Sequence, residues 1–204
     1  LQDWPGRRLG YKGSSPPPEY FAMLKDAGID HGSVELIRVG YNPRVLTDGD
    51  VDILAVFKSN EPDTIRNILG REVVVWDPRD YGVPIIGLTY VTRKSLIDGS
   101  SDLVERFLKA SLKGLQYAVE NPDDSVDIVM EFAPKENREH QVFMLATEIA
   151  DAENLLTDSN GLGWMTDGQW EKLYDYLMNF GALPKPFEVK TAYTDRFLKE
   201  IYKD

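Results

Sequence analysis

Short apolar runs alternate with stretches of helical spacing over the first half of the chain. Two of the runs, Val51–Phe57 and Glu72–Trp76, are apolar on both faces. This pattern is typical of strands that helices cover on each side, so it predicts a parallel sheet in an α/β fold. Strands are predicted at Arg7–Lys12, Val34–Val39, Val51–Phe57, Glu72–Trp76 and Leu88–Thr92, and helices at Pro18–Ala27, Arg44–Thr47 and Glu61–Leu69.

From Ser101 the pattern becomes almost entirely helical. One apolar stripe predicts an amphipathic helix that stops at Asn121-Pro122. Its residues are Leu103, Phe107, Leu108, Leu112, Leu115 and Val119. Such a stripe is more typical of a packed core than of a cofactor site. Further helices are predicted at Ser125–Phe132, Arg138–Asn154, Asp167–Asn179 and Tyr193–Tyr202.

The segment Asn60-Glu61 is the sharpest candidate for ligand binding. In open parallel sheets, ligands bind outside the carboxyl ends of the strands, and this segment follows such an end. Asn60 offers a donor and an acceptor, and the Glu61 carboxylate accepts N–H bonds, so the pair matches the polar edge of an aminopyrimidine. The alternative is an ordinary helix start, with Asn60 as the cap and Glu61 placed favourably at the helix dipole.

The loops after the first two predicted strands add three candidates. Ser14 and Ser15 precede a helix whose N-terminus would offer backbone N–H groups to an anionic or carbonyl group. Alternatively, Ser15 simply caps that helix. Tyr41 lies just past a strand, where its ring is able to stack on a flat ligand or to pack over its own loop.

Tyr81 and Gly82 belong to the turn-rich segment that leads from residue 77 to the strand predicted at Leu88–Thr92. The segment follows the strand predicted at Glu72–Trp76, so it begins outside the carboxyl end of a strand, where ligands of open sheets bind. A surface loop with a half-buried tyrosine is the alternative.

The chain carries 34 acidic and 23 basic side chains among 204 residues, for a net charge of -11. Such a surface repels phosphate backbones and anionic lipid, so no nucleic-acid partner is expected. No run approaches the roughly 18 apolar residues of a membrane span. A membrane would therefore be reached only through a leader or lipid anchor outside this sequence.

Motifs for catalysis are absent from the sequence. The chain has no cysteine, which excludes disulfides, thiolate catalysis and cysteine-based metal sites. Its two histidines, His31 and His140, have no partner at metal-ligand spacing, and each is expected on the solvated surface. No GxSxG elbow, P-loop or GxGxxG occurs. We therefore expect neither an enzyme nor a bound metal or cofactor.

Six segments together carry a resemblance to a known family. The chain resembles the NMT1/THI5-like periplasmic solute-binding proteins of ABC importers over nearly its whole length. Within that family it is most similar to the branch that binds thiamine-precursor pyrimidines, riboflavin or similar heterocycles. The segments are GYKGSSPPPEYF, VELIRVGYNP, LTDGDVDILAVFKSNEP, VVVWDPRDYGVPIIGLTYVT, LVERFLKASLKGLQYAVENP and LGWMTDGQWEKLYDYL.

The resemblance implies a type II periplasmic-binding-protein fold. Residues 6–86 would form an α/β ligand-binding lobe, and residues 87–204 would supply a crossover strand and the helical part of the other lobe. The resemblance also implies that Tyr81 and Gly82 lie at the mouth of the cleft and at a hinge, which needs only a few residues to absorb backbone change. Family members begin with a further segment of about a hundred residues that builds the first half of one lobe. The chain is therefore expected to be a fragment, or to have that lobe completed by another chain, or to have lost it.

The function implied is capture of a small aromatic heterocycle for a membrane permease. The protein would be periplasmic or extracellular, and a lipoprotein anchor is one possibility that the resemblance leaves open. Two other functions stay open. One is a ligand-sensing domain of a signalling receptor. The other is a synthase of the thiamine pyrimidine, as in the family's eukaryotic branch, whose cysteine-rich iron motif this chain does not have.

Overall fold

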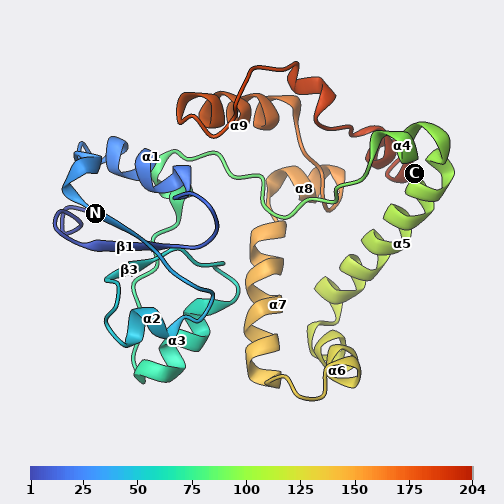
Figure 1. Cartoon of the computed structure of the whole chain (residues 1–204). Helices are drawn as coiled ribbons and strands as arrows, with labels where there is room; N and C mark the ends of the chain where they lie inside the picture. The colour runs from blue at the N-terminus through green and yellow to red at the C-terminus, as the bar shows by residue number, and fades with distance from the viewer. Residues whose placement is uncertain (204) are drawn as a thin grey trace. The chain divides into compact units, whose positions relative to one another are not determined.

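The computed structural model describes residues 1–203 as two compact units (Figure 1). The first unit comprises Leu1–Ile85 together with Lys172–Pro186. The second comprises Ile86–Glu171 and the chain from Phe187 onward. The lobes expected at 6–86 and 87–204 concern a whole binding protein and stay a prediction.

A parallel sheet forms the centre of the first unit. Its strands are β1 (Arg8–Tyr11), β2 (Glu35–Arg38) and β3 (Ile53–Leu54), in the spatial order β2-β1-β3. Both pairings with β1 are parallel, as the apolar runs predicted, with Leu9 opposite Leu36 on one side and opposite Ile53 on the other. The α/β fold class is therefore confirmed.

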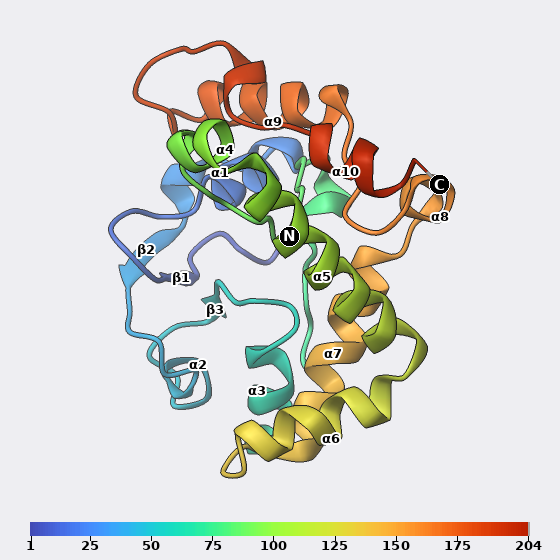
Figure 2. The ribbon, with the colours of Figure 1, turned by 90° about the vertical axis from the view of Figure 1, so that its right-hand side faces the viewer.

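Helices cover both faces of this sheet. Ile53 joins one apolar cluster with Leu9 and Leu24, and Leu54 joins another with Ile65. Successive residues of a strand point to opposite faces, so the two clusters lie on the two faces. Figure 2 shows the first helix on one side of the strands and the next two on the other. The helices are α1 (Pro18–Asp26), α2 (Arg44–Thr47) and α3 (Glu61–Leu69), with short 3-10 turns η1 (His31–Ser33) and η2 (Pro78–Tyr81).

Three strand predictions are wrong in extent or in kind. The run Val51–Phe57 forms only the two residues of β3, and neither Glu72–Trp76 nor Leu88–Thr92 forms a strand among the described residues. Val74 is 72% exposed and Val91 is 89% exposed. A branched apolar run favours extended backbone, but a strand also needs a neighbour to pair its N–H and C=O groups. These two segments have no such neighbour among residues 1–203.

The second unit is helical. The stripe predicted on α5 is only partly buried, since Leu112 is covered whereas Leu103 and Phe107 are exposed. Val104, which lies off the stripe, is buried instead. The helix predicted from Ser125 begins earlier, because proline is favoured in the first turn. Its helices are α4 (Lys94–Gly99), α5 (Ser101–Glu120), α6 (Pro122–Phe132), α7 (Arg138–Ala152), α8 (Leu155–Asn160), the start of α9 (Asp167–Asn179), η3 (Val189–Thr191) and α10 (Arg196–Ile201).

None of the described helices combines the length and apolarity needed to cross a bilayer.

Gly161, at the end of α8, lies in close contact with Tyr202, the residue that follows α10. Gly161 ends α8 with φ 102° and ψ 155°, a conformation that is essentially restricted to glycine. A Cβ placed there would lie 2.4 Å from the Tyr202 ring. The Tyr202 hydroxyl in turn donates a hydrogen bond to the Leu162 carbonyl oxygen at 2.9 Å. Gly161 therefore allows the aromatic ring to close over the end of α8.

We predict that Gly161→Ala lowers the free energy of unfolding by about 3 kcal/mol, because it adds a steric overlap to the backbone strain. The matched control is Gly163→Ala, since Gly163 also has a positive φ but no atom closer than 3.6 Å to an added Cβ. The control should cost only about 1 kcal/mol for the backbone. Urea denaturation measures both, and equal losses would contradict the predicted overlap with Tyr202.

Candidate functional site

All three strands of the first unit end at the same edge of the sheet. The backbone N–H of Val39 donates to the Tyr11 carbonyl at 2.9 Å, and that of Ala55 donates to the Gly10 carbonyl at 3.0 Å. The loops that follow β1, β2 and β3 therefore start side by side. They carry five of the predicted residues, which are Ser14, Ser15, Tyr41, Asn60 and Glu61.

A buried ion pair lies at this edge. Lys12, the first residue after β1, places its Nζ against Oε1 of Glu61, the first residue of α3. The other carboxylate oxygen, Oε2, accepts a hydrogen bond from the Phe57 backbone N–H at 2.9 Å. The side chains of Lys12 and Glu61 are only 11% and 9% exposed. The pair thus connects the end of the central strand to the start of α3 inside the protein.

The helix-start explanation of Asn60 and Glu61 does not describe their side chains. Asn60 occupies the cap position of α3, but its side chain makes no capping hydrogen bond there. Glu61 lies in the first turn, where the dipole favours a carboxylate, yet it is buried rather than solvated. Burying a carboxylate is costly unless a partner compensates it, and Lys12 supplies that compensation. Stability of the helix start alone does not require this arrangement.

The Ser14-Ser15 loop differs from its expected role. The cap position of α1 belongs to Pro17, and no side chain caps this helix, so the alternative that Ser15 is a cap is wrong. Pro18 and Glu19 open the helix, which removes one N–H donor and places a carboxylate in the first turn. The N-terminus of α1 is therefore a poor binding site for an anion. Both serines are exposed, and their role in binding stays a prediction.

Tyr41 follows β2 and is 76% exposed. The alternative in which its ring packs over its own loop is therefore wrong. An exposed ring in a strand-end loop is available for stacking on a flat ligand.

Tyr81 and Gly82 are held near this edge by charges. Asp77 accepts a hydrogen bond from the Arg79 backbone N–H at 3.0 Å and pairs with the Arg79 guanidinium at 2.6 Å. Lys58, in the loop after β3, reaches the same carboxylate at 3.6 Å. Tyr81 ends η2 half-buried against the core, and Gly82 follows with φ 72°. The hinge role of these two residues stays a prediction.

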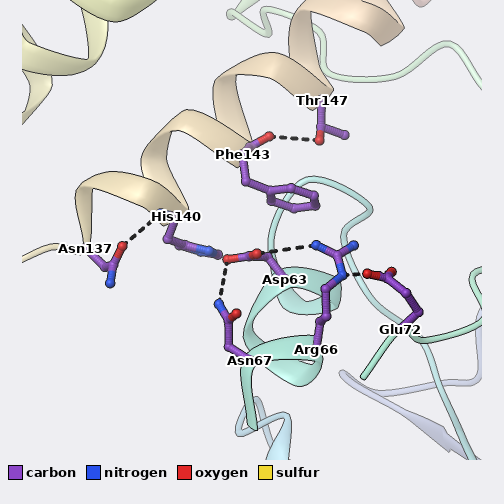
Figure 3. Close-up of polar contacts among 8 residues, drawn as sticks. All are labelled: Asp63, Arg66, Asn67, Glu72, Asn137, His140, Phe143 and Thr147. Carbon is purple, nitrogen blue, oxygen red and sulfur yellow. Dashed lines mark hydrogen bonds and ion pairs between the residues drawn. The ribbon is translucent and has the colours of Figure 1, made fainter. Parts of the chain in front are cut away.

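The segment between α3 and η2 is attached to α3 by further polar contacts (Figure 3). Arg66 donates from Nε to Glu72 at 3.0 Å and lies 3.5 Å from Asp63, which also accepts a bond from Asn67 at 3.3 Å. These contacts anchor the start of the unpaired apolar segment at Glu72.

The same figure shows how α7 of the second unit begins. The Asn137 side chain accepts a hydrogen bond from the His140 backbone N–H at 3.0 Å. The His140 ring stacks on Phe143 and is half-buried, so the expectation of a solvated His140 is wrong. His31 is exposed, as expected. Among residues 1–203, no group of three or more potential ligands is placed to hold a metal ion.

Sequence reasoning missed Lys12, Lys58 and Asp77. A signal for Lys12 was present, since a lone lysine ends the strand predicted at Arg7–Lys12 and is followed by glycine and serine. The pattern could not show that its partner is Glu61, because 49 residues separate the two. Only the parallel pairing of β1 with β3 brings them together.

The Arg79 side chain, which donates hydrogen bonds to Asp77, lowers the pKa of that carboxyl from 3.8 to about 2. A carboxyl whose pKa is lower in the folded state contributes stability above its unfolded pKa and loses it as the pH falls through the folded one. We predict that Asp77→Asn costs about 1 kcal/mol at neutral pH after solvent screening. The deficit should be complete above about pH 4 and should shrink towards pH 2.

Unfolding free energies of wild type and variant between pH 2 and 7 check this prediction. The matched control is Asp80→Asn, because Asp80 is exposed in the same turn. A deficit for Asp77→Asn that is independent of pH would contradict it.

Comparison with known proteins gives three curated relatives. The chain is 28% identical to the riboflavin-binding protein RibY of Chloroflexus aurantiacus, over 97% of the chain and 58% of the relative. It is 24% identical to the formylaminopyrimidine-binding protein of Halalkalibacterium halodurans, over 94% and 59%. It is 22% identical to the 4-amino-5-hydroxymethyl-2-methylpyrimidine phosphate synthase of Legionella pneumophila, over 100% and 64%.

The chain thus spans 58–64% of the length of these relatives. A family model described as NMT1/THI5 like matches residues 1–125, which is more than half of the chain and includes every residue of the candidate site. The resemblance seen in the sequence is therefore confirmed, and the chain belongs to the NMT1/THI5-like family.

Proposed function

We propose that this chain is part of a solute-binding protein that captures a small aromatic heterocycle, such as an aminopyrimidine or a flavin. The observation that carries the proposal is the buried Glu61 carboxylate, which Lys12 and the Phe57 N–H hold at the carboxyl edge of a parallel sheet. Ligands of open α/β sheets bind at this edge. Two relatives with binding-protein names, one for riboflavin and one for formylaminopyrimidine, support it.

Recognition would divide between aromatic surface and polar edge. Tyr41 and Tyr81 would stack on the faces of the ring, and Asn60 and Glu61 would bond its N–H and N groups. The exposed hydroxyls of Ser14 and Ser15 would meet the substituents. Apolar contact supplies most of the affinity in such sites, and the few polar groups fix orientation.

The transport role is part of the proposal, and the family resemblance supports it. The protein would deliver its ligand to the permease of an ABC importer, outside the cytoplasm. Residues 6–86 would act as the ligand-binding lobe and residues 87–204 as part of the other lobe. Closure about the Tyr81-Gly82 segment would then enclose the ligand.

A second function is favoured by one observation, the full-length likeness of this chain to a pyrimidine phosphate synthase. That relative is the least similar of the three at 22% identity. Binding of a pyrimidine without turnover supports the transport or sensing role, whereas formation of a phosphorylated pyrimidine would support the synthase.

The direct test is a thermal-shift screen of the 204-residue chain against 4-amino-5-hydroxymethyl-2-methylpyrimidine, formylaminopyrimidine, riboflavin, taurine and nitrate. A ligand that binds only the folded state raises the unfolding midpoint. We expect a shift with at least one heterocycle and none with taurine or nitrate. No heterocycle shift, or a shift with the anions alone, would overturn the proposal.

Tyr41→Ala tests the stacking contact. Because the ring is 76% exposed, we expect the unfolding midpoint of the free protein to stay unchanged. The dissociation constant for the heterocycle should rise about tenfold, since loss of one aromatic contact costs on the order of 1 kcal/mol. Tyr90→Ala is the control, as Tyr90 is also exposed but belongs to the other unit. Isothermal titration calorimetry measures both, and equal affinities would remove Tyr41 from the site.

A further inference from the structure

We infer that Lys12 is a positioning residue that makes the site select an uncharged heterocycle. The inference rests on the proposed function, because it names the ligand class of the same site. Lys12 contacts Glu61 and acts on the ligand through that carboxylate.

The charges of Lys12 and Glu61 lie together at the carboxyl edge of the sheet. The Lys12 and Glu61 side chains are nearly closed to solvent and contact each other directly. The next cations along this edge, Lys58 and Arg79, are exposed and share the Asp77 carboxylate. The buried positive charge is therefore matched by the buried negative charge beside it.

The Glu61 carboxylate has acceptor positions that its partners in the protein do not occupy. An ionised carboxylate has about four acceptor positions on its two oxygens. Lys12 occupies a position on Oε1, and the Phe57 N–H occupies one on Oε2. One position on each oxygen remains for N–H donors, the pattern that the amino and ring N–H groups of a heterocycle supply. Lys12 and the Phe57 N–H together also fix the orientation of the carboxylate before a ligand arrives.

The charge of the ligand determines the cost of bringing it next to this ion pair. A buried ion pair has no net charge, and its attraction offsets the cost of removing both ions from water. A cationic ligand would be repelled by Lys12, and an anionic one by Glu61. Either would bring an uncompensated charge into a poorly solvated place. A neutral ligand avoids this cost.

A purely structural role for Lys12 predicts something else. The ion pair would then only join β1 to α3, and its loss would weaken the binding of all ligands equally through reduced stability. The charge preference of the site separates the two roles, because reduced stability does not favour one ligand charge over another.

The experiment compares two probes of nearly equal size. One is 4-amino-5-hydroxymethyl-2-methylpyrimidine, which is neutral at pH 7. The other is its 5-aminomethyl analogue, whose amine is protonated at that pH. Titration calorimetry gives the ratio of the two dissociation constants for the wild type, for Lys12→Met and for Lys12→Arg. Lys25→Met is the control, since Lys25 is an exposed lysine in the last turn of α1.

We expect the wild type to prefer the neutral probe. Lys12→Met leaves the Glu61 charge uncompensated, so the ratio should shift about tenfold or more towards the cationic probe. Lys12→Arg should restore the wild-type ratio, and Lys25→Met should leave it unchanged. An equal loss of affinity for both probes in Lys12→Met, or an unchanged ratio, would overturn the inference.

Two further variants keep the test decisive if Lys12→Met does not fold. Glu61→Gln leaves the lysine charge in place and should shift the ratio in the opposite direction, away from the cationic probe. The double variant Lys12→Met/Glu61→Gln has neither charge and should show a ratio near that of the wild type. Shifts in the same direction for Glu61→Gln and for the double variant would overturn the inference.

Binding by the wild type separates a failure of the proposed function from a failure of the inference about Lys12. If the wild type binds neither probe nor riboflavin, the proposed function fails and this inference falls with it. If it binds a heterocycle but shows no charge preference that depends on Lys12, the proposed function stands and only the inference fails.

Discussion

The parallel pairing of β1 with strands on both of its sides is the constraint on which the first unit depends. Leu9, at the centre of β1, is fully buried. The Arg8 guanidinium and backbone N–H bond the Asp52 carboxylate, which holds the start of β3 beside the start of β1. Because all three strands run the same way, their carboxyl ends meet, and the loops that carry the candidate site begin from one edge.

The buried Lys12–Glu61 pair is a consequence of that arrangement. Neither charge would be stable alone at this depth, since a buried ion without a partner costs several kcal/mol. A well-packed apolar pair would often serve stability equally well. Folding stability alone therefore does not account for the ion pair at this edge, where the proposed ligand site lies. The exposed Tyr41 ring, in the loop after β2, is a second feature that stability does not require.

Two apolar segments are only partly covered by the packed cores. Residues 72–76 and 88–92 are rich in branched side chains, yet several of these are exposed and neither segment joins a strand among the described residues. In the first, Val73 and Trp76 pack against the cores, whereas Val74 and Val75 are exposed. The α5 stripe is similar, with Phe107 exposed against the edge of Tyr90. In each case the apolar side chains are only partly buried, because burial and strand pairing need another segment to pack against.

The sequence by itself determined the α/β class, the parallel direction of the strands, and the helices α3 and α5 nearly to the residue. It also predicted, from the strand ends, the loops that carry the candidate site. These follow from local periodicity and from the rule that parallel strands end at one edge. Only the tertiary structure decided that Glu61 is buried rather than solvated, that Lys12 is its partner, and that the run Glu72–Trp76 stays unpaired. The physical reason is that burial, ion pairing and strand pairing are properties of two segments brought together, and no pattern within one segment contains them.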